Sequence, residues 1–228
     1  MSILWAFGTC VFTILIFQLM KALYQKYNYP LLVPVATSTT VIIVLLLLFN
    51  IPYDTYLQGG SWIGELLGPA VVALAFPLYK NKEILKKYFA PVVVGVLIGA
   101  SIGILSGLTF ASLLNIDKEV LISLIPKNVT TPIAMDIASM SGGIPTLAAV
   151  YVTIAGVGGA MFGPTILKLC RIHHYIGVGV GFGTASHGIG TARALEIGQK
   201  EAAISSISMI LSAIFAAVVC PILISVVL

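Results

Sequence analysis

Long apolar segments alternate along the chain with short segments that carry most of its charges. Seven stretches contain no Asp, Glu, Lys or Arg: 1–20, 27–53, 66–79, 88–116, 137–167, 172–192 and 202–228. All but 66–79 are long enough for a membrane helix, which needs about 20 mostly apolar residues. The pattern predicts about seven membrane helices in one domain over 1–228, at roughly 3–24, 31–49, 62–79, 89–114, 144–167, 176–197 and 202–228.

Composition supports a helical membrane fold and excludes two other classes. Hydrophobic residues make up 59% of the chain and charged residues 9%, whereas about 25% of residues are charged in an ordinary soluble domain. So few polar side chains cannot cover a soluble core of this size. The run 41–48 is apolar on every face, whereas the strands of a membrane barrel alternate. We therefore expect an all-α, polytopic membrane helical bundle.

The positive residues assign sides to the helices. The segments 21–26, 80–87 and 168–171 hold 8 of the 12 Lys and Arg residues, and short loops rich in these residues face the cytoplasm. Lys21 and Lys26 follow the first apolar stretch, whereas a cleaved signal peptide carries its positive charge in front. With all three loops cytoplasmic, an even number of crossings separates the second from the third. We therefore expect the apolar piece 129–140 to be a re-entrant or half-length helix.

Four glycines repeat at every fourth position of the predicted helix 89–114: Gly95, Gly99, Gly103 and Gly107. This spacing forms a groove along one helix face, where a second backbone can approach closely. Two interpretations follow. The groove packs against another helix of the same chain, or it is the seam of a homo-oligomer.

Two polar segments interrupt the apolar pattern. In the first, Asn128, Thr130 and Thr131 precede Pro132, an order typical of a helix start, with polar caps followed by proline in the first turn. The second, 183–196, surrounds a histidine with small residues and glycines. It predicts a break near 186–190 and a new helix from about residue 191.

Such breaks indicate a binding site. Non-helical backbone in a bilayer is costly unless protein or a wet cavity surrounds it, and the first turn of a helix attracts anions. Transporters place discontinuous helices near the membrane midplane. We therefore expect the two segments to converge on a small carboxylate. The expected substrate-binding residues are Asn128, Thr130, Thr131, Pro132, Ser186, His187, Gly188, Gly190, Thr191 and Arg193.

Each ionisable residue also has a structural interpretation. His187 titrates near neutrality and would couple transport to protons, or it hydrogen-bonds a carbonyl freed by the break. Arg193 gives the site positive charge, or its side chain extends to the interface. Asp136 is a second candidate for ion or proton coupling, or a paired structural charge. Glu65 is expected in the first turn of the helix 62–79, after a loop over 50–61.

No arrangement typical of an enzyme or a metal site is evident. Cys10, Cys170 and Cys220 have neither metal nor disulfide spacing, and the net charge of +4 lies in short loops, where it indicates topology rather than nucleic-acid binding. We expect no catalysis and no cofactor. Polar residues near Pro34 resemble those near Pro132, which favours an inverted repeat.

Four motifs connect the chain with known proteins: Gly59–Trp62, Pro77–Lys82, Leu124–Ala134 and Gly183–Ala194. In these motifs, and over nearly its whole length, the chain resembles the LrgB/CidB family of bacterial membrane proteins. Asp136 and the pair Met140-Ser141 depart from the family's pattern.

The resemblance implies two functions. In one, the protein and an LrgA/CidA-like membrane partner regulate murein hydrolase activity and cell lysis as antiholin and holin. In the other, family members carry small monocarboxylates; plant plastid relatives carry glycolate and glycerate, and some bacterial pairs resemble pyruvate carriers. The residues favour a secondary carrier of the pyruvate, lactate or glycolate class in the bacterial cytoplasmic membrane, with an LrgA/CidA-like partner. The antiholin-like regulator is the alternative, and a pore-forming holin fits so many broken helices poorly.

Overall fold

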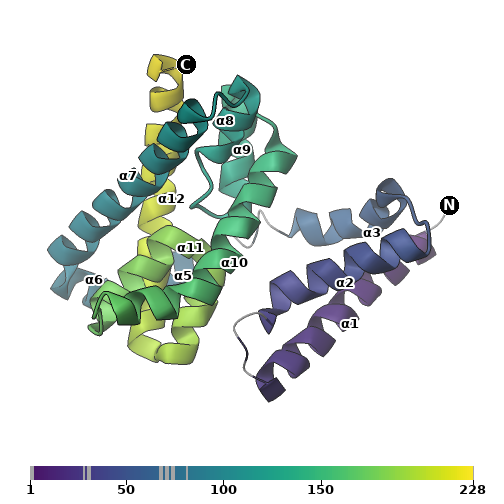
Figure 1. Cartoon of the computed structure of the whole chain (residues 1–228). Coiled ribbons are helices and arrows are strands. Elements are labelled where there is room, and N and C mark those ends of the chain that lie inside the picture. The colour runs from purple at the N-terminus through teal and green to yellow at the C-terminus, as the bar shows by residue number, and fades with distance from the viewer. Residues whose placement is uncertain are drawn as a thin grey trace. The chain divides into compact units, whose positions relative to one another are not determined.

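The computed structural model describes residues 3–27, 29, 32–66, 69, 72, 75–80 and 82–227, and α-helix is the main regular structure throughout them. These residues belong to two compact units, Met1–Val72 and Ala73–Leu228 (Figure 1). The prediction of an all-α chain is confirmed over the described range. Four helices are long and apolar enough to cross a membrane: α1 (Ile3–Tyr27), α7 (Phe89–Leu113), α10 (Pro145–Leu169) and α12 (Gln199–Val227).

In the unit Met1–Val72, α1 packs against both α2 (Pro34–Leu48) and α3 (Tyr53–Glu65). A side chain on Gly59 would overlap the Thr9 hydroxyl and the Ala6 carbonyl, so glycine is what lets α3 lie directly on α1. The Thr13 and Tyr56 hydroxyls hydrogen-bond at 2.8 Å between the same two helices.

Two expectations for this unit are wrong. The segment 50–61 is not a loop, because α3 begins at Tyr53, and Glu65 ends that helix instead of opening one. Pro52 is the N-cap, and Asp54 in the first turn is favourable at a helix start because its negative charge lies at the positive end of the helix dipole. Two adjacent glycines have poor helix propensity, but the contact with α1 compensates for it.

Of the roughly seven predicted spans, the described residues provide four. With 15 residues, α2 rises about 22 Å, less than the roughly 30 Å of a hydrocarbon core. The predicted helix 62–79 falls partly on positions 67, 68, 70, 71, 73 and 74, which lie outside the described residues. Its end coincides with α5 (Ala75–Lys80), and α6 (Lys82–Lys87) follows in what was predicted as a loop.

The predicted span 176–197 is α11 (Tyr175–Ile197), which folds back on itself. His187 interrupts it with φ 41° and ψ −130°. A Cβ on Gly190 would lie 2.7 Å from the carbonyl oxygen of Phe182, so the second half returns beside the first. A straight helix of 23 residues would span about 34 Å. Instead, the Lys200 ammonium at the start of α12 lies 5.7 Å from the centre of the Tyr175 ring.

This geometry corrects the expected course of the segment. The break falls within the predicted range, but it is at His187, and the helix resumes at Gly188 and not near residue 191. Both feet of this α11 hairpin lie at the same end of the unit, so α11 does not span it. Glycine at position 190 removes the side chain that would otherwise separate the two halves.

A second helical hairpin consists of α8 (Lys118–Leu124), the turns 125–130 and α9 (Thr131–Ser141). It leaves the end of α7 and leads into α10. The Ser123 hydroxyl, near the end of α8, accepts a hydrogen bond of 2.7 Å from the N–H of Ile144, the N-cap of α10. Its apolar side chains form the largest core cluster of the described residues together with α7, α10 and α12.

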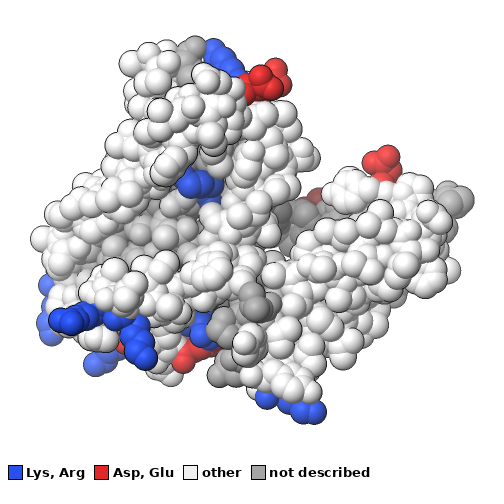
Figure 2. All heavy atoms as spheres, in the orientation of Figure 1, with Lys and Arg blue, Asp and Glu red and all other residues white. Residues whose placement is uncertain are grey.

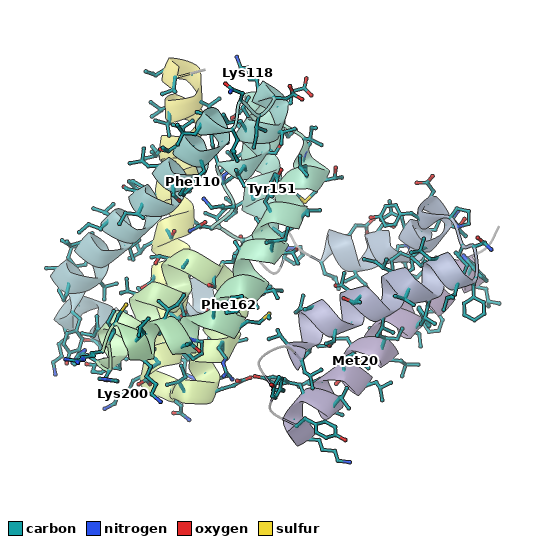
Figure 3. The ribbon with its side chains drawn as sticks, in the orientation of Figure 1. Met20, Phe110, Lys118, Tyr151, Phe162 and Lys200 are labelled. Atoms are coloured by element: carbon teal, nitrogen blue, oxygen red, sulfur yellow. The ribbon has the colours of Figure 1, made fainter. Side chains whose placement is uncertain are left out.

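The two hairpins start from opposite ends of the unit Ala73–Leu228. Figure 3 places Lys118, the first residue of α8, and Lys200, just after α11, at these opposite ends. Figure 2 shows Lys and Arg side chains gathered where α6 lies and α12 begins, and a smaller mixed group of charges at α8. This difference in charge matches the basic segments 80–87 and 168–171 used to assign the cytoplasmic side.

Candidate functional site

The tips of the two hairpins meet inside this unit. The side-chain amide of Asn128, in the tip between α8 and α9, donates to the Thr184 carbonyl oxygen of α11 at 3.4 Å. Thr184 lies one turn before the break at His187, and its hydroxyl donates to the Val180 carbonyl at 2.7 Å. The structure thus brings together the two polar segments that the sequence singled out.

The glycine groove of α7 holds both tips. Side chains on Gly95 and Gly99 would lie 3.1 Å from Val180 Cγ1 and 2.9 Å from Thr184 Oγ1 on α11. Towards the other hairpin, a side chain on Gly103 would overlap the Asn128 amide, and one on Gly107 would lie 2.8 Å from Lys127 Nζ. The four glycines therefore face neighbours of the same chain, which corresponds to the intramolecular interpretation.

The meeting point lies well inside the long helices. Gly103 is 14 residues after Phe89 and ten before Leu113, so it is about 15 Å along the axis from the nearer end of α7. His187 contacts Val152, seven residues after Pro145 at the start of α10. Non-helical backbone therefore lies away from the ends of these two helices, inside the unit.

His187 is buried, with 4% of its surface exposed. Its Nε2 lies 3.0 Å from the Val152 carbonyl oxygen, and because a carbonyl only accepts, that nitrogen carries the proton. A side chain on Gly156 would lie 2.7 Å from the same nitrogen. The ring therefore makes the carbonyl contact of its structural interpretation, although Val152 lies in a neighbouring helix and not at the break.

Ser186 and Thr191 fix the two halves of α11. Ser186 is buried, and a side chain on Gly159 of α10 would lie 2.7 Å from its Cβ. The Thr191 hydroxyl donates to the His187 carbonyl and hydrogen-bonds the Ser205 hydroxyl of α12, both at 2.8 Å. Among the glycines predicted here, Gly190 is buried at the fold-back and Gly188 is exposed.

The start of α9 has the predicted order. Thr130 is the N-cap in an extended conformation, Thr131 is the first helical residue, and Pro132 lies in the first turn. The Thr130 hydroxyl makes no capping hydrogen bond, and its oxygen is buried without a partner among the described residues. A buried hydroxyl without a partner is unfavourable, so this atom is a candidate ligand contact.

Two predicted charged residues lie elsewhere. Arg193 forms an ion pair with Glu196 in the last turns of α11, where the two residues lie six and nine positions after the break at His187. Asp136 is exposed on α9, whereas its neighbours Ala134 and Ile137 face the core. The structure does not bring Asp136 to the hairpin tips.

Sequence reasoning missed a row of serines on α12. Ser205, Ser208 and Ser212 are each no more than 1% exposed, and the hydroxyls of Ser208 and Ser212 have no partner among the described residues. A Cβ on Gly183 would lie 2.7 Å from Ser208 Cβ, so this row borders α11 next to the turn that Asn128 contacts. The signal was present in the spacing, which puts all three serines on one helix face.

Lys127 was also missed as a site residue. It separates two apolar pieces of the sequence, and the structure puts its ammonium on the Gly103 carbonyl of α7. Its charge in an otherwise apolar stretch was a signal that could have been used. Over the described ranges, no three His, Cys, Asp or Glu side chains are grouped so that they could hold a metal ion.

Comparisons with known proteins cover nearly the whole chain. The model of the LrgB-like family matches residues 13–226, which extend over both units. The uncharacterised protein YxaC of Bacillus subtilis is 45% identical over 202 residues, 89% of this chain and 88% of its own. The holin-like proteins CidB of Staphylococcus epidermidis and Staphylococcus aureus are 34% and 35% identical over 212 residues, 93% of each chain. No solved structure matches.

Proposed function

Because the chain belongs to the LrgB-like family of membrane proteins, we propose that it is a secondary carrier of small monocarboxylates across the bacterial cytoplasmic membrane. The observation that carries this proposal is the contact between the two hairpin tips, where Asn128 donates to the Thr184 carbonyl. Both tips contain backbone or polar side chains that a lipid-facing helix would not contain. A protein that acts only by association does not need this arrangement.

In a bilayer crossed by α7, α10 and α12, the two hairpins would be re-entrant from opposite sides. A conformational change of this unit would open the site at the two tips first to one side of the membrane and then to the other. Many secondary carriers have inverted repeats with discontinuous helices that meet near the midplane. The opposed hairpins fit this architecture and support the inverted repeat expected from the sequence.

The chemistry of the tips suits a small carboxylate. The first turn of α9 supplies N–H groups and the positive end of a helix dipole, and Thr130 adds a buried hydroxyl. We propose pyruvate, lactate or glycolate as the substrate class. Asn128, Thr131, Pro132 and the stretch Ser186–Thr191 would border the substrate, and His187 is a better candidate for proton coupling than the exposed Asp136.

Uptake into liposomes tests the carrier function. Purified protein, with and without an LrgA/CidA-like partner, is expected to accumulate labelled pyruvate above protein-free liposomes. Two changes are expected to abolish this uptake: His187→Ala removes the buried ring, and Thr130→Val removes a hydroxyl with no described partner and should leave the fold intact. Wild-type uptake equal to that of protein-free liposomes, under both conditions, would refute the proposal.

The antiholin-like regulator is the second candidate, and the relatives favour it more directly, because two of them are named holin-like proteins. It requires association with a partner but no transport. The groove glycines are unsuitable for testing it, because they face α11 and the Asn128 tip. The better comparison is lysis control in cells carrying Thr130→Val: normal lysis control without uptake would favour the regulator.

A further inference from the structure

Lys127 places a positive charge deep within the unit Ala73–Leu228. It lies in the tip between α8 and α9, and its Nζ donates to the Gly103 carbonyl oxygen. The absence of a side chain at Gly107 allows this approach. Gly103 is about 15 Å from the end of α7.

This ammonium has no carboxylate to balance it among the residues that the structure describes. Ion pairs there join Lys86 to Glu83 and Arg193 to Glu196, and neither includes Lys127. The buried thiol of Cys220 is close enough to Lys127 for an electrostatic interaction. A thiol is ordinarily neutral near pH 7 and does not compensate the charge.

Burying an uncompensated charge is unfavourable, and an ionisable side chain at membrane depth commonly marks a ligand or ion path. An ammonium has three N–H donors. Gly103 accepts from one of them, which leaves two for a ligand. Lys127 is partly buried rather than fully enclosed.

The same tip contains a polar group with no described partner. The Thr130 oxygen is buried with no described hydrogen bond, three residues further along the same tip. The side-chain oxygen Oδ1 of Asn128 is also buried with no described partner, whereas its Nδ2 donates to the Thr184 carbonyl. The hydroxyl of Thr130 can donate to an anion, and it stands at the positive end of α9.

We propose that Lys127 binds the carboxylate of the transported monocarboxylate, with the Thr130 hydroxyl and the first turn of α9 completing the anion site. This inference rests on the carrier function proposed above. The other two ionisable donors of the predicted site are already engaged: Arg193 with Glu196, and the His187 ring with the Val152 carbonyl. Lys127 differs from them because its charge has no described carboxylate partner, and an anionic ligand would compensate it.

Three substitutions separate charge from structure. Lys127→Gln removes the charge but retains an amide that can donate to the Gly103 carbonyl, Lys127→Met removes both, and Lys127→Arg keeps the charge. Lys118→Gln is the matched control, because Lys118 is an exposed lysine at the start of the same hairpin. Each purified variant is assayed for labelled pyruvate uptake, and for the rise in Tm caused by pyruvate and by its neutral analogue pyruvamide.

For the wild type and Lys118→Gln, pyruvate but not pyruvamide is expected to raise the Tm. Both neutral variants of Lys127 are expected to lose this rise and at least about tenfold of the uptake, as the loss of a charge-assisted contact predicts. Uptake by Lys127→Gln equal to that of the wild type would mean that transport needs only the hydrogen bond to Gly103 and not the charge, and would overturn the inference.

Failure of the inference is distinct from failure of the carrier function. Wild-type uptake with unchanged uptake in Lys127→Gln overturns the role of Lys127 alone. No uptake by the wild type overturns both. If neither neutral variant folds, Lys127→Arg decides: a retained pyruvate-dependent rise in Tm supports the assignment, and its loss overturns it.

Discussion

The break at His187 can be tested by asking whether position 187 prefers glycine to alanine. Both His187→Ala and His187→Gly remove the ring and its hydrogen bond to Val152, so they differ only in one methyl group. In a continuous helix alanine is favoured by about 1 kcal/mol, and burial of the methyl group adds about 0.8 kcal/mol. With φ 41° and ψ −130°, however, any side chain carries strain of about 1–3 kcal/mol.

These terms give different stability differences between the two variants for a broken and for a continuous helix. A continuous helix would make His187→Gly less stable than His187→Ala by about 1.8 kcal/mol, the sum of the propensity and burial terms. The strain in the broken helix reduces this difference or reverses it. Strain of about 1 kcal/mol leaves alanine favoured by about 0.8 kcal/mol, and strain of about 3 kcal/mol makes glycine favoured by about 1.2 kcal/mol. The two variants should therefore unfold within about 1 kcal/mol of each other.

Ala194→Gly is the matched control, because Ala194 is fully buried in a helical part of α11. It is expected to cost the full amount of about 1.8 kcal/mol, or roughly 4–7 °C in Tm for a chain of this size. Thermal unfolding of all variants in the same detergent measures both differences. If His187→Gly falls below His187→Ala by as much as Ala194→Gly falls below the wild type, α11 is continuous and the hairpin is wrong.

Two further pairs of substitutions test the packing around the tips. Gly159→Ala should destabilise the protein by about 1–3 kcal/mol through overpacking, because its Cβ would lie 2.7 Å from Ser186 Cβ, whereas Gly158→Ala has nothing within 4 Å and should be neutral or stabilising in thermal unfolding; equal Tm values would contradict the contact between α10 and α11. Ser208→Ala should leave the Tm unchanged or raise it while lowering pyruvate uptake, because its hydroxyl has no described partner. Ser205→Ala should lower the Tm by losing the bond to Thr191, worth about 1 kcal/mol; the opposite order of the two Tm values would show that the serine row is placed wrongly.

The sequence alone determined the class of fold and the location of the polar interruptions. Long charge-free stretches require membrane helices because lipid offers no hydrogen bonds to an unfolded backbone, and α7, α10 and α12 follow the predicted spans closely. Asn128–Pro132 and the stretch around His187 were recognisable because caps, proline and glycine act on the backbone next to them. These are local effects, which adjacent residues decide.

Tertiary structure decided what those interruptions do. The charge-free stretch 172–192 contributed to the prediction of a span over 176–197, but only the packing of Gly190 on Phe182 shows that α11 turns back. The segment 50–61 was predicted as a loop, whereas in the structure most of it is helical and packs on α1 through Gly59. Lys127 and the serines of α12 became candidate site residues only through their contacts. Lys127 donates to the Gly103 carbonyl, and the serine row borders α11. Contacts between residues far apart in the chain depend on the folded positions of both partners, and the spacing of residues along one segment contains no information about the other.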